Sequence, residues 1–259
     1  MALHSVCGIC MNRGSGEPMF VPLHDGVPLL NMKTPVMTRV LIAGCIIVYP
    51  LTFYGPIGAD WIVAGFGLIP SVFFGTEALP DGLPFVPVWL TLATSIFLHG
   101  SVIHLIGNML FLWVFGDNVE DAMGHVRFLV FFVACGSVAA LVHAFVDPES
   151  GRPLIGASGG VSGIVAAYLI LYPRVRLWAL FLNGIPLKLP AVFAIGFWFV
   201  LQLASALFGG DEAVGWFAHL GGFVAGAILI LVLRRRYDAV LARVEAQGAR
   251  AGFQPDLHP

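Results

Sequence analysis

Residues 156–163 read Gly156-Ala157-Ser158-Gly159-Gly160-Val161-Ser162-Gly163 and open an apolar segment that ends at Tyr172. A serine hydroxyl among small residues at the start of a membrane helix is a candidate nucleophile. Gly159 and Gly163 form a small-xxx-small face, which allows the backbone of another helix to approach closely. The sequence therefore predicts that a second glycine-faced helix packs against this one.

The second helix is predicted from residues 218–226, which read Ala218-His219-Leu220-Gly221-Gly222-Phe223-Val224-Ala225-Gly226. His219 lies three residues before Gly222 and seven before Gly226, so the three residues share one helix face. If the two glycine faces pack together, Ser158 meets His219.

The composition is that of a polytopic membrane protein. Of the 259 residues, 58% are hydrophobic and 11% are charged, and the mean hydropathy is +0.90. A soluble domain does not need so much apolar surface, so we expect the lipid bilayer to surround the chain. The net charge of −2 argues against a nucleic-acid partner.

Six apolar segments are candidate membrane spans, and they predict an all-α fold. They are residues 36–54, 96–115, 127–146, 158–172, 189–208 and 214–233. All approach the ~20 residues that a helix needs to cross a bilayer, except the fourth, which is short. A short fourth span places Ser158 below the membrane surface, at the floor of a cavity.

Charges predict the orientation. With the N-terminus in the cytoplasm, the basic residues fall inside and most acidic residues of the loops fall outside, as the positive-inside rule requires. The inside residues are Lys33, Arg39, Arg127, Arg174, Arg176, Lys188, Arg234, Arg235 and Arg236; the outside acids are Asp60, Glu77, Asp81, Asp147, Glu149, Asp211 and Glu212, with Arg152 the one basic residue there. We expect an integral protein of a bacterial inner membrane with both termini in the cytoplasm.

Three regions follow from these spans. Residues 1–35 are a mostly irregular cytoplasmic arm, residues 36–236 are the six-span domain, and residues 237–259 are a cytoplasmic tail. The connection at 55–95 is long and rich in proline and aromatic residues, so we expect it to lie in the membrane interface.

The N-terminal arm carries one Cys-x-x-Cys pair, Cys7 and Cys10. A zinc site would need two more ligands, and His4 and His24 are the nearby imidazoles. No cleavable signal peptide is predicted, and Met19 is an alternative start of translation. We predict no metal and no cofactor.

Polar residues inside membrane spans are costly, so they indicate function. His104 and Asn108, four residues apart, share a face of the second span near its outer end, at the depth of Ser158 and His219. A serine needs an adjacent base, for which His219 is the candidate. Asn108, His104 and the Ser158 backbone N–H can donate to a developing oxyanion. No carboxylate lies nearby, so the prediction is a dyad.

Structural explanations compete with this one. Ser158 can be a packing residue, and His104 with Asn108 can link helices or bind a metal. Trp198 and Gln202 on the fifth span either line a gap for substrate entry or, for Gln202, form a helix–helix hydrogen bond. Glu120 most simply ties a loop by a hydrogen bond.

Four motifs together resemble those of the rhomboid intramembrane serine proteases. They are residues 97–109 (with His99, His104 and Asn108), residues 115–121 (Phe115-Gly116-Asp117-Asn118-Val119-Glu120-Asp121), Ile155-Gly156-Ala157-Ser158-Gly159, and Ala218-His219-Leu220-Gly221-Gly222 with Gly226. The resemblance spans about residues 36–236. It implies a six-helix bundle in which Ser158 is the nucleophile, His219 the base, and His104 and Asn108 the oxyanion donors.

Two positions depart from the family pattern. Many rhomboids have a Trp-Arg pair in the first loop, whereas Leu90 follows Trp89 here, so the anchoring of this loop is open. Many also have an aromatic residue four positions after the nucleophile, where this chain has Ser162. Trp216, Phe217 and Trp198 are the candidates to pack against His219 instead.

The expected function is hydrolysis of peptide bonds in or near the transmembrane segment of single-span membrane proteins. One alternative is a catalytically inactive rhomboid-like protein that binds membrane clients. Another is a small transporter or channel, which is disfavoured because no inverted repeat and no intramembrane carboxylate are visible. The sequence does not indicate the oligomeric state.

Overall fold

The structure is a computed structural model that describes residues 20–80, 82–83, 85–181, 184–209 and 214–234. Cys7, Cys10, the alternative start at Met19 and the tail at 237–259 lie outside the described residues.

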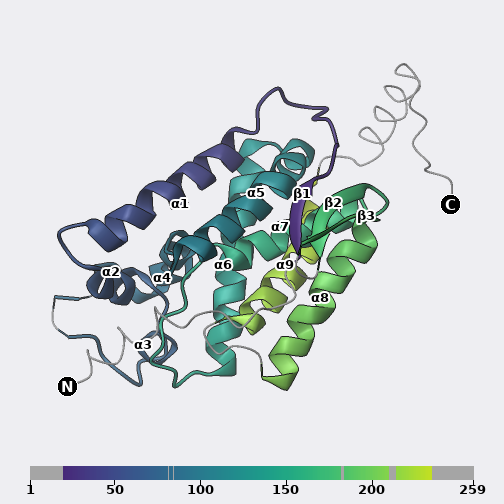
Figure 1. Cartoon of the computed structure of the whole chain (residues 1–259). Coiled ribbons are helices and arrows are strands. Elements are labelled where there is room, and N and C mark those ends of the chain that lie inside the picture. The colour runs from purple at the N-terminus through teal and green to yellow at the C-terminus, as the bar shows by residue number, and fades with distance from the viewer. Residues whose placement is uncertain (1–19, 81, 84, 182–183, 210–213, 235–259) are drawn as a thin grey trace, which may run out of the picture.

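Helices dominate the described part of the chain (Figure 1). The long ones are α1 (Val36–Tyr54), α5 (Val102–Met123), α6 (His125–Val146), α8 (Ala191–Phe208) and α9 (Trp216–Leu233), and α7 (Ser158–Leu171) is shorter. By length and composition the five long helices can each cross a membrane, and α7 has only 14 residues. The prediction of an all-α polytopic membrane fold with a short fourth span is confirmed.

The second span differs from its prediction at both ends. Residues 91–97 form the short helices α4 (Thr91–Thr94) and η4 (Ser95–Phe97), and α5 starts afresh at Val102. Ser101 sets this start, because its extended backbone and its side chain, which accepts from the His104 N–H at 3.1 Å, form an N-cap.

The far end of α5 continues to Met123 although it carries acidic side chains that are rare in membrane helices. Glu120 and Asp121 are buried, and their oxygens accept hydrogen bonds from the preceding part of the chain. Because these partners replace water, the helix can carry the two carboxylates to its end.

The region before α1 is docked on the bundle through these carboxylates. Asp121 accepts from the backbone N–H groups of Leu30, Asn31 and Met32 at 2.8–3.0 Å. Glu120 accepts from the N–H groups of Met37 and Thr38 at 2.9 and 2.8 Å, and it also contacts His125. Glu120 thus satisfies the free N–H groups of the first turn of α1, which is the tying role predicted for it.

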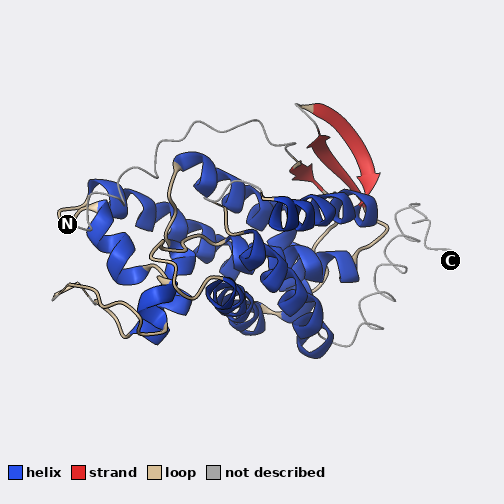
Figure 2. Cartoon of the chain, turned by 90° about the horizontal axis from the view of Figure 1, so that it is seen from below, coloured by secondary structure: helices blue, strands red, loops and turns tan. Residues whose placement is uncertain are grey.

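A three-stranded sheet is a further part of the fold that the sequence did not predict. Antiparallel strands β1 (Val21–His24), β2 (Arg176–Phe181) and β3 (Ile185–Pro190) follow the order β1-β2-β3. They lie together at one side of the helical body (Figure 2). Burial of Asp25, which follows β1, raises the pKa of its carboxyl, which accepts from the Tyr168 hydroxyl at 2.9 Å.

Helix α7 lies at the centre, in contact with α5, α6 and α9 (Figure 1). Most of its side chains are buried, and Tyr168 packs edge-on against Phe115 of α5 with ring centroids 4.8 Å apart. The largest fully buried side chains include Tyr168, Phe115, Phe128, Phe131 and Phe132. The helix that starts with Ser158 is therefore held on several sides, which fixes the position of its first turn.

The connections divide between the two ends of the bundle. Ser71 donates its N–H to the Ser150 carbonyl at 3.0 Å, so the loops at 55–95 and 147–157 share one end. The docked arm, Glu120, Asp121 and the sheet gather at the other end. This division matches the predicted grouping of the loops at the two ends.

Candidate active site

Ser158 is the first residue of α7, where a helix has backbone N–H groups without helical partners. The chain reaches it through a short extended segment that other loops hold in place. Leu154 exchanges two backbone hydrogen bonds with Leu68, at 2.7 and 3.1 Å, and the Gly156 N–H donates to the Ser95 carbonyl at 2.9 Å. The long loop at 55–95 thus positions the segment that presents Ser158.

Gly156 lies between Ser158 and His104. A Cβ built on Gly156 would be 2.7–2.8 Å from the His104 ring and 3.7 Å from the Ser158 Oγ. The φ angle of Gly156 is +134°, a conformation that side-chain-bearing residues rarely adopt. Glycine is therefore required at position 156 for two reasons, the nearby His104 ring and the positive φ angle. Its small size lets the imidazole of His104 and the hydroxyl of Ser158 approach the same space.

Asn108 lies one turn after His104 on α5 and is buried. Its Nδ2 has no hydrogen-bond partner among the described residues. A buried donor without a partner costs about 1–3 kcal/mol, so it calls for an explanation. A substrate oxygen that appears only during reaction is the kind of partner such a donor can serve.

His99 is fully buried beside His104, with ring centroids 5.2 Å apart. Its Nδ1 lies 3.3 Å from the Phe97 carbonyl oxygen, to which it donates, because a carbonyl can only accept. The His99 Nε2 has no partner among the described residues. His99 therefore packs against the His104 ring and limits where that ring can turn.

Helix α9 turns its glycine face onto the backbone of α7, as predicted, but the glycine face of α7 is turned toward α6. A Cβ on Gly159 would be 2.4 Å from the Ala139 Cβ, and one on Gly163 would be 2.5 Å from the Cys135 Sγ. A Cβ on Gly222 would be 2.1 Å from the Gly159 carbonyl oxygen, and one on Gly226 would be 2.3 Å from the Gly163 carbonyl oxygen. The contact of Gly222 with Gly159 is next to Ser158 on α7 and one turn after His219 on α9. The packing therefore brings the predicted nucleophile and the predicted base to the same level of the bundle.

The ring of His219 is held by two neighbours. Its Nδ1 lies 2.7 Å from the Oε1 of Gln202 on α8. The Trp216 ring packs edge-on against it, with centroids 6.0 Å apart and an interplanar angle of 83°. His104 and His143 lie within electrostatic range of the imidazole. Gln202 thus forms the helix–helix hydrogen bond that was one of its two predicted roles.

The comparisons with known proteins now bear on this arrangement. A family described as the Rhomboid domain matches residues 87–236, which is more than half of the chain and includes all four predicted catalytic and oxyanion residues. The chain belongs to the rhomboid family. It is an integral membrane protein with a rhomboid fold, as the motifs indicated.

Several curated proteins are similar to this rhomboid chain. RHOMBOID-like protein 5 of Arabidopsis thaliana is 32% identical over 58% of the chain and 46% of the relative. Presenilin-associated rhomboid-like protein A, mitochondrial, of Danio rerio is 31% identical over 57% and 39%. Rhomboid protease GluP of Bacillus subtilis is 30% identical over 53% and 25%. The matched region spans less than half of each of these relatives.

The departures from the rhomboid pattern now have structural counterparts. Ser162, where many rhomboids have an aromatic residue, is buried, and Trp216 supplies the aromatic contact to His219. The signal in the sequence was the spacing of three residues between Trp216 and His219, which puts both on one face of α9. In place of a Trp-Arg pair, the first loop is anchored by the Leu68–Leu154 bridge and by Thr94, whose hydroxyl donates to the Phe66 carbonyl at 2.6 Å.

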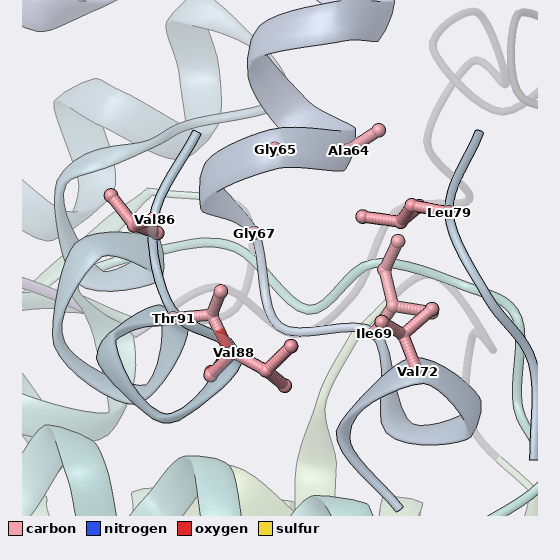
Figure 3. A pocket seen from close by; sticks show the side chains of 9 residues that line it. All are labelled: Ala64, Gly65, Gly67, Ile69, Val72, Leu79, Val86, Val88 and Thr91. Carbon is pink, nitrogen blue, oxygen red and sulfur yellow. Dashed lines mark hydrogen bonds between the residues drawn. The ribbon is translucent and has the colours of Figure 1, made fainter. Parts of the chain in front are cut away.

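A small apolar pocket lies inside the first loop of this rhomboid (Figure 3). Its lining residues are Ala64, Gly65, Gly67, Ile69, Val72, Leu79, Val86, Val88 and Thr91. None of these side chains is an acid, a base or an activated nucleophile. The pocket therefore belongs to the packing of the loop and takes no part in the candidate chemistry.

Trp198, the other residue of the predicted substrate-entry gap, packs among aromatic rings. Trp198 on α8 lies between Phe111 of α5 and Phe223 of α9, with ring centroids 6.1 and 6.4 Å away. Substrate entry past Trp198 stays a prediction.

Proposed function

We propose that the chain is an intramembrane serine protease that cleaves single-span membrane proteins in or near their transmembrane segments. The observation that carries this proposal is the close approach of Gly222 to the Gly159 backbone, one residue after Ser158 on α7 and three residues after His219 on α9. The relative named Rhomboid protease GluP supports a proteolytic activity for the shared region.

The proposed chemistry begins when His219 takes the proton of the Ser158 hydroxyl. The Ser158 oxygen attacks the carbonyl carbon of the scissile peptide bond, and the electron pair of that C=O bond moves to oxygen. When the tetrahedral intermediate collapses, the C–N bond breaks and the imidazolium of His219 gives its proton to the leaving amine. Water then hydrolyses the acyl-enzyme by the same steps.

The oxyanion would be stabilised by donors around Gly156. The unpartnered Nδ2 of Asn108, the His104 ring and the backbone N–H of Ser158 are the candidates. Donors that are already placed need no reorganisation when the charge develops, and they are stronger where water is excluded.

The proposed pair of Ser158 and His219, with its oxyanion donors, needs no metal. We therefore expect cleavage to continue in EDTA. Loss of activity on chelation, with recovery on adding zinc, would contradict the proposal.

The substrate must expose a peptide bond, because the backbone of a formed helix is hydrogen-bonded to itself. We therefore expect helix-breaking residues near the cleavage site to promote cleavage.

The deciding experiment uses the purified full chain in detergent, with a fluorophosphonate probe and a panel of single-span substrates. Wild-type protein should be labelled and should cleave at least one substrate, whereas Ser158→Ala should do neither. If wild type and Ser158→Ala are labelled to the same low extent and neither cleaves, the protein is better explained as an inactive, client-binding rhomboid.

Placement in the cell is part of the proposal. We propose that residues 36–236 form the membrane domain and that both termini face the cytoplasm. The relatives named above come from a plant, animal mitochondria and a bacterium. The comparisons therefore do not support the expected bacterial inner membrane over other membranes.

A further inference from the structure

Gln202 stands out on a helix that has few buried residues. Helix α8 buries only Ala191, Ala194, Ile195 and Gln202 among its described residues, and Gln202 is the one with a polar side chain. Its side chain is 8% exposed, and its Oε1 lies 2.7 Å from the Nδ1 of His219. The amide group of Gln202 thus points from α8 into the bundle, where it contacts His219, the proposed base.

This contact determines where the proton of a neutral His219 lies. An amide oxygen only accepts hydrogen bonds, so the Nδ1 of His219 must carry the proton. The lone pair of the neutral ring is then on Nε2, which is the nitrogen that can accept the proton of a serine hydroxyl.

We propose that Gln202 is a positioning residue that fixes the tautomer and the ring orientation of His219, so that Ser158, His219 and Gln202 act as a triad with a neutral third member. This inference rests on the proposed protease function. In the reaction, the Ser158 proton moves to Nε2, and the imidazolium keeps its Nδ1–H bond to the Gln202 oxygen. That bond becomes stronger, because a charged donor replaces a neutral one.

The chemistry of the surroundings explains why an amide can replace the carboxylate that completes many triads. A carboxylate inside a membrane span is costly to desolvate, whereas an amide carries no charge. Trp216 packs edge-on against the ring of His219 and supplies the aromatic contact. The amide of Gln202 is therefore needed only to orient that ring.

The test compares three full-length variants in detergent. Gln202→Met keeps the size of the side chain but removes the acceptor, Gln202→Glu keeps an acceptor oxygen, and Leu203→Met is the matched control on the same helix, where Leu203 is 39% exposed. We expect Gln202→Met to lower kcat by about 10- to 100-fold with little change in KM, a part of the 10²–10⁴ that general-base catalysis supplies. Gln202→Glu should keep most of kcat, and Leu203→Met should match wild type.

A second measurement, by NMR, determines the tautomer of His219 directly. It needs only wild-type protein and the His219→Ala variant as a reference. In protein with 15N-labelled histidine, the His219 ring signals are assigned by their loss in His219→Ala. We expect a protonated Nδ1 and an unprotonated Nε2 at neutral pH. Protonated Nε2 with bare Nδ1 would mean that the Gln202 amide donates instead, and it would overturn the proposal even if Gln202→Met does not fold.

The outcomes separate this inference from the proposed function. If wild type neither cleaves nor is labelled at Ser158, the protease function fails and the role of Gln202 fails with it. If wild type cleaves but Gln202→Met keeps its kcat, only the role of Gln202 is overturned.

Discussion

The four polar residues of the site divide the proposed work unequally. Ser158 and His219 act as a unit, because the base has no other proton to take, so removing both should cost little more than removing either. In the proposed mechanism, His104 and Asn108 are each one of several oxyanion donors. Losing one such donor costs about 10²–10³ in rate in a well-studied hydrolase. We predict that Asn108→Ala and His104→Ala keep measurable cleavage and are slowly labelled by a fluorophosphonate.

The measurement is turnover and labelling of the purified single and double variants, side by side. Ser158→Ala is the control that should not be labelled. A Ser158→Ala protein that is labelled like wild type, or a His219→Ala protein with full turnover, would show that the protease interpretation is wrong.

Gly156 gives a second prediction at the scale of one residue. An alanine Cβ would be 2.7 Å from the His104 ring, and the φ of +134° adds strain. His104 must then move away from Ser158, and a displacement of about 1 Å can cost about 10²-fold in rate. Gly156→Ala should therefore cleave at least as slowly as His104→Ala.

Gly107→Ala on α5 is the matched control, because nothing lies within 4 Å of the Cβ that it would add. If Gly156→Ala cleaves like Gly107→Ala, the space beside Gly156 is not used in the reaction.

At the scale of elements, the contact of α7 with α9 depends on the absence of side chains. Gly222→Ala would place a Cβ 2.1 Å from the Gly159 carbonyl oxygen, so the helices must separate. Overpacking of this kind costs about 1–3 kcal/mol, and separation also moves His219 away from Ser158. We predict a lower unfolding temperature in detergent and a loss of cleavage.

Gly196→Ala on α8 tests whether the effect is specific to the interface, since no atom lies within 4 Å of its added Cβ. This variant should unfold no earlier than wild type, because alanine favours a helix more than glycine does. Equal destabilisation of both variants would argue against the role of the α7–α9 contact.

The elements also show what the sequence could and could not reveal. Long apolar segments predicted the helices, and the glycine spacing of α9 predicted its contact with α7, because both depend on local patterns. The glycines of α7 proved to face α6, which local spacing could not reveal. The sheet was missed because its strands have only four to six residues and lie in segments that connect or precede the predicted spans. The alternating burial of Leu177 and Ala179 against exposed Trp178 is a period of two, but it becomes meaningful only when β1 lies beside it.

The same limit applies to the site. Ser158, His219, His104 and Asn108 were predicted as site residues because polar residues are rare in membrane helices. The hydrogen bond between His219 and Gln202 joins residues that are 17 positions apart on two helices. Only the packing of α8 on α9 decides whether these two side chains meet. The length of α5 was likewise misjudged, since the partners of Glu120 and Asp121 come from 82–91 residues earlier in the chain.

At the scale of the whole molecule, several basic residues gather at one end of the bundle. Lys33 lies beside the arm residues that Asp121 binds, and Arg176 and Lys188 lie in the sheet at the same end. Glu77 and Glu149 lie in the loops at the other end, where Ser71 contacts Ser150. The positive-inside rule then predicts that the end with the sheet faces the cytoplasm and that the end near Ser158 faces outward.

Single-cysteine labelling tests this orientation, and the chain suits it. Cys45 and Cys135 are fully buried, so replacing Cys7 and Cys10 by serine leaves little background. Position 149 and position 33 are both exposed and lie at opposite ends. We predict that a membrane-impermeant maleimide labels Glu149→Cys in intact cells and labels Lys33→Cys only after lysis. Labelling of position 149 only after lysis would show that the orientation is the reverse of the predicted one. The proposed cleavage site would then face the cytoplasm.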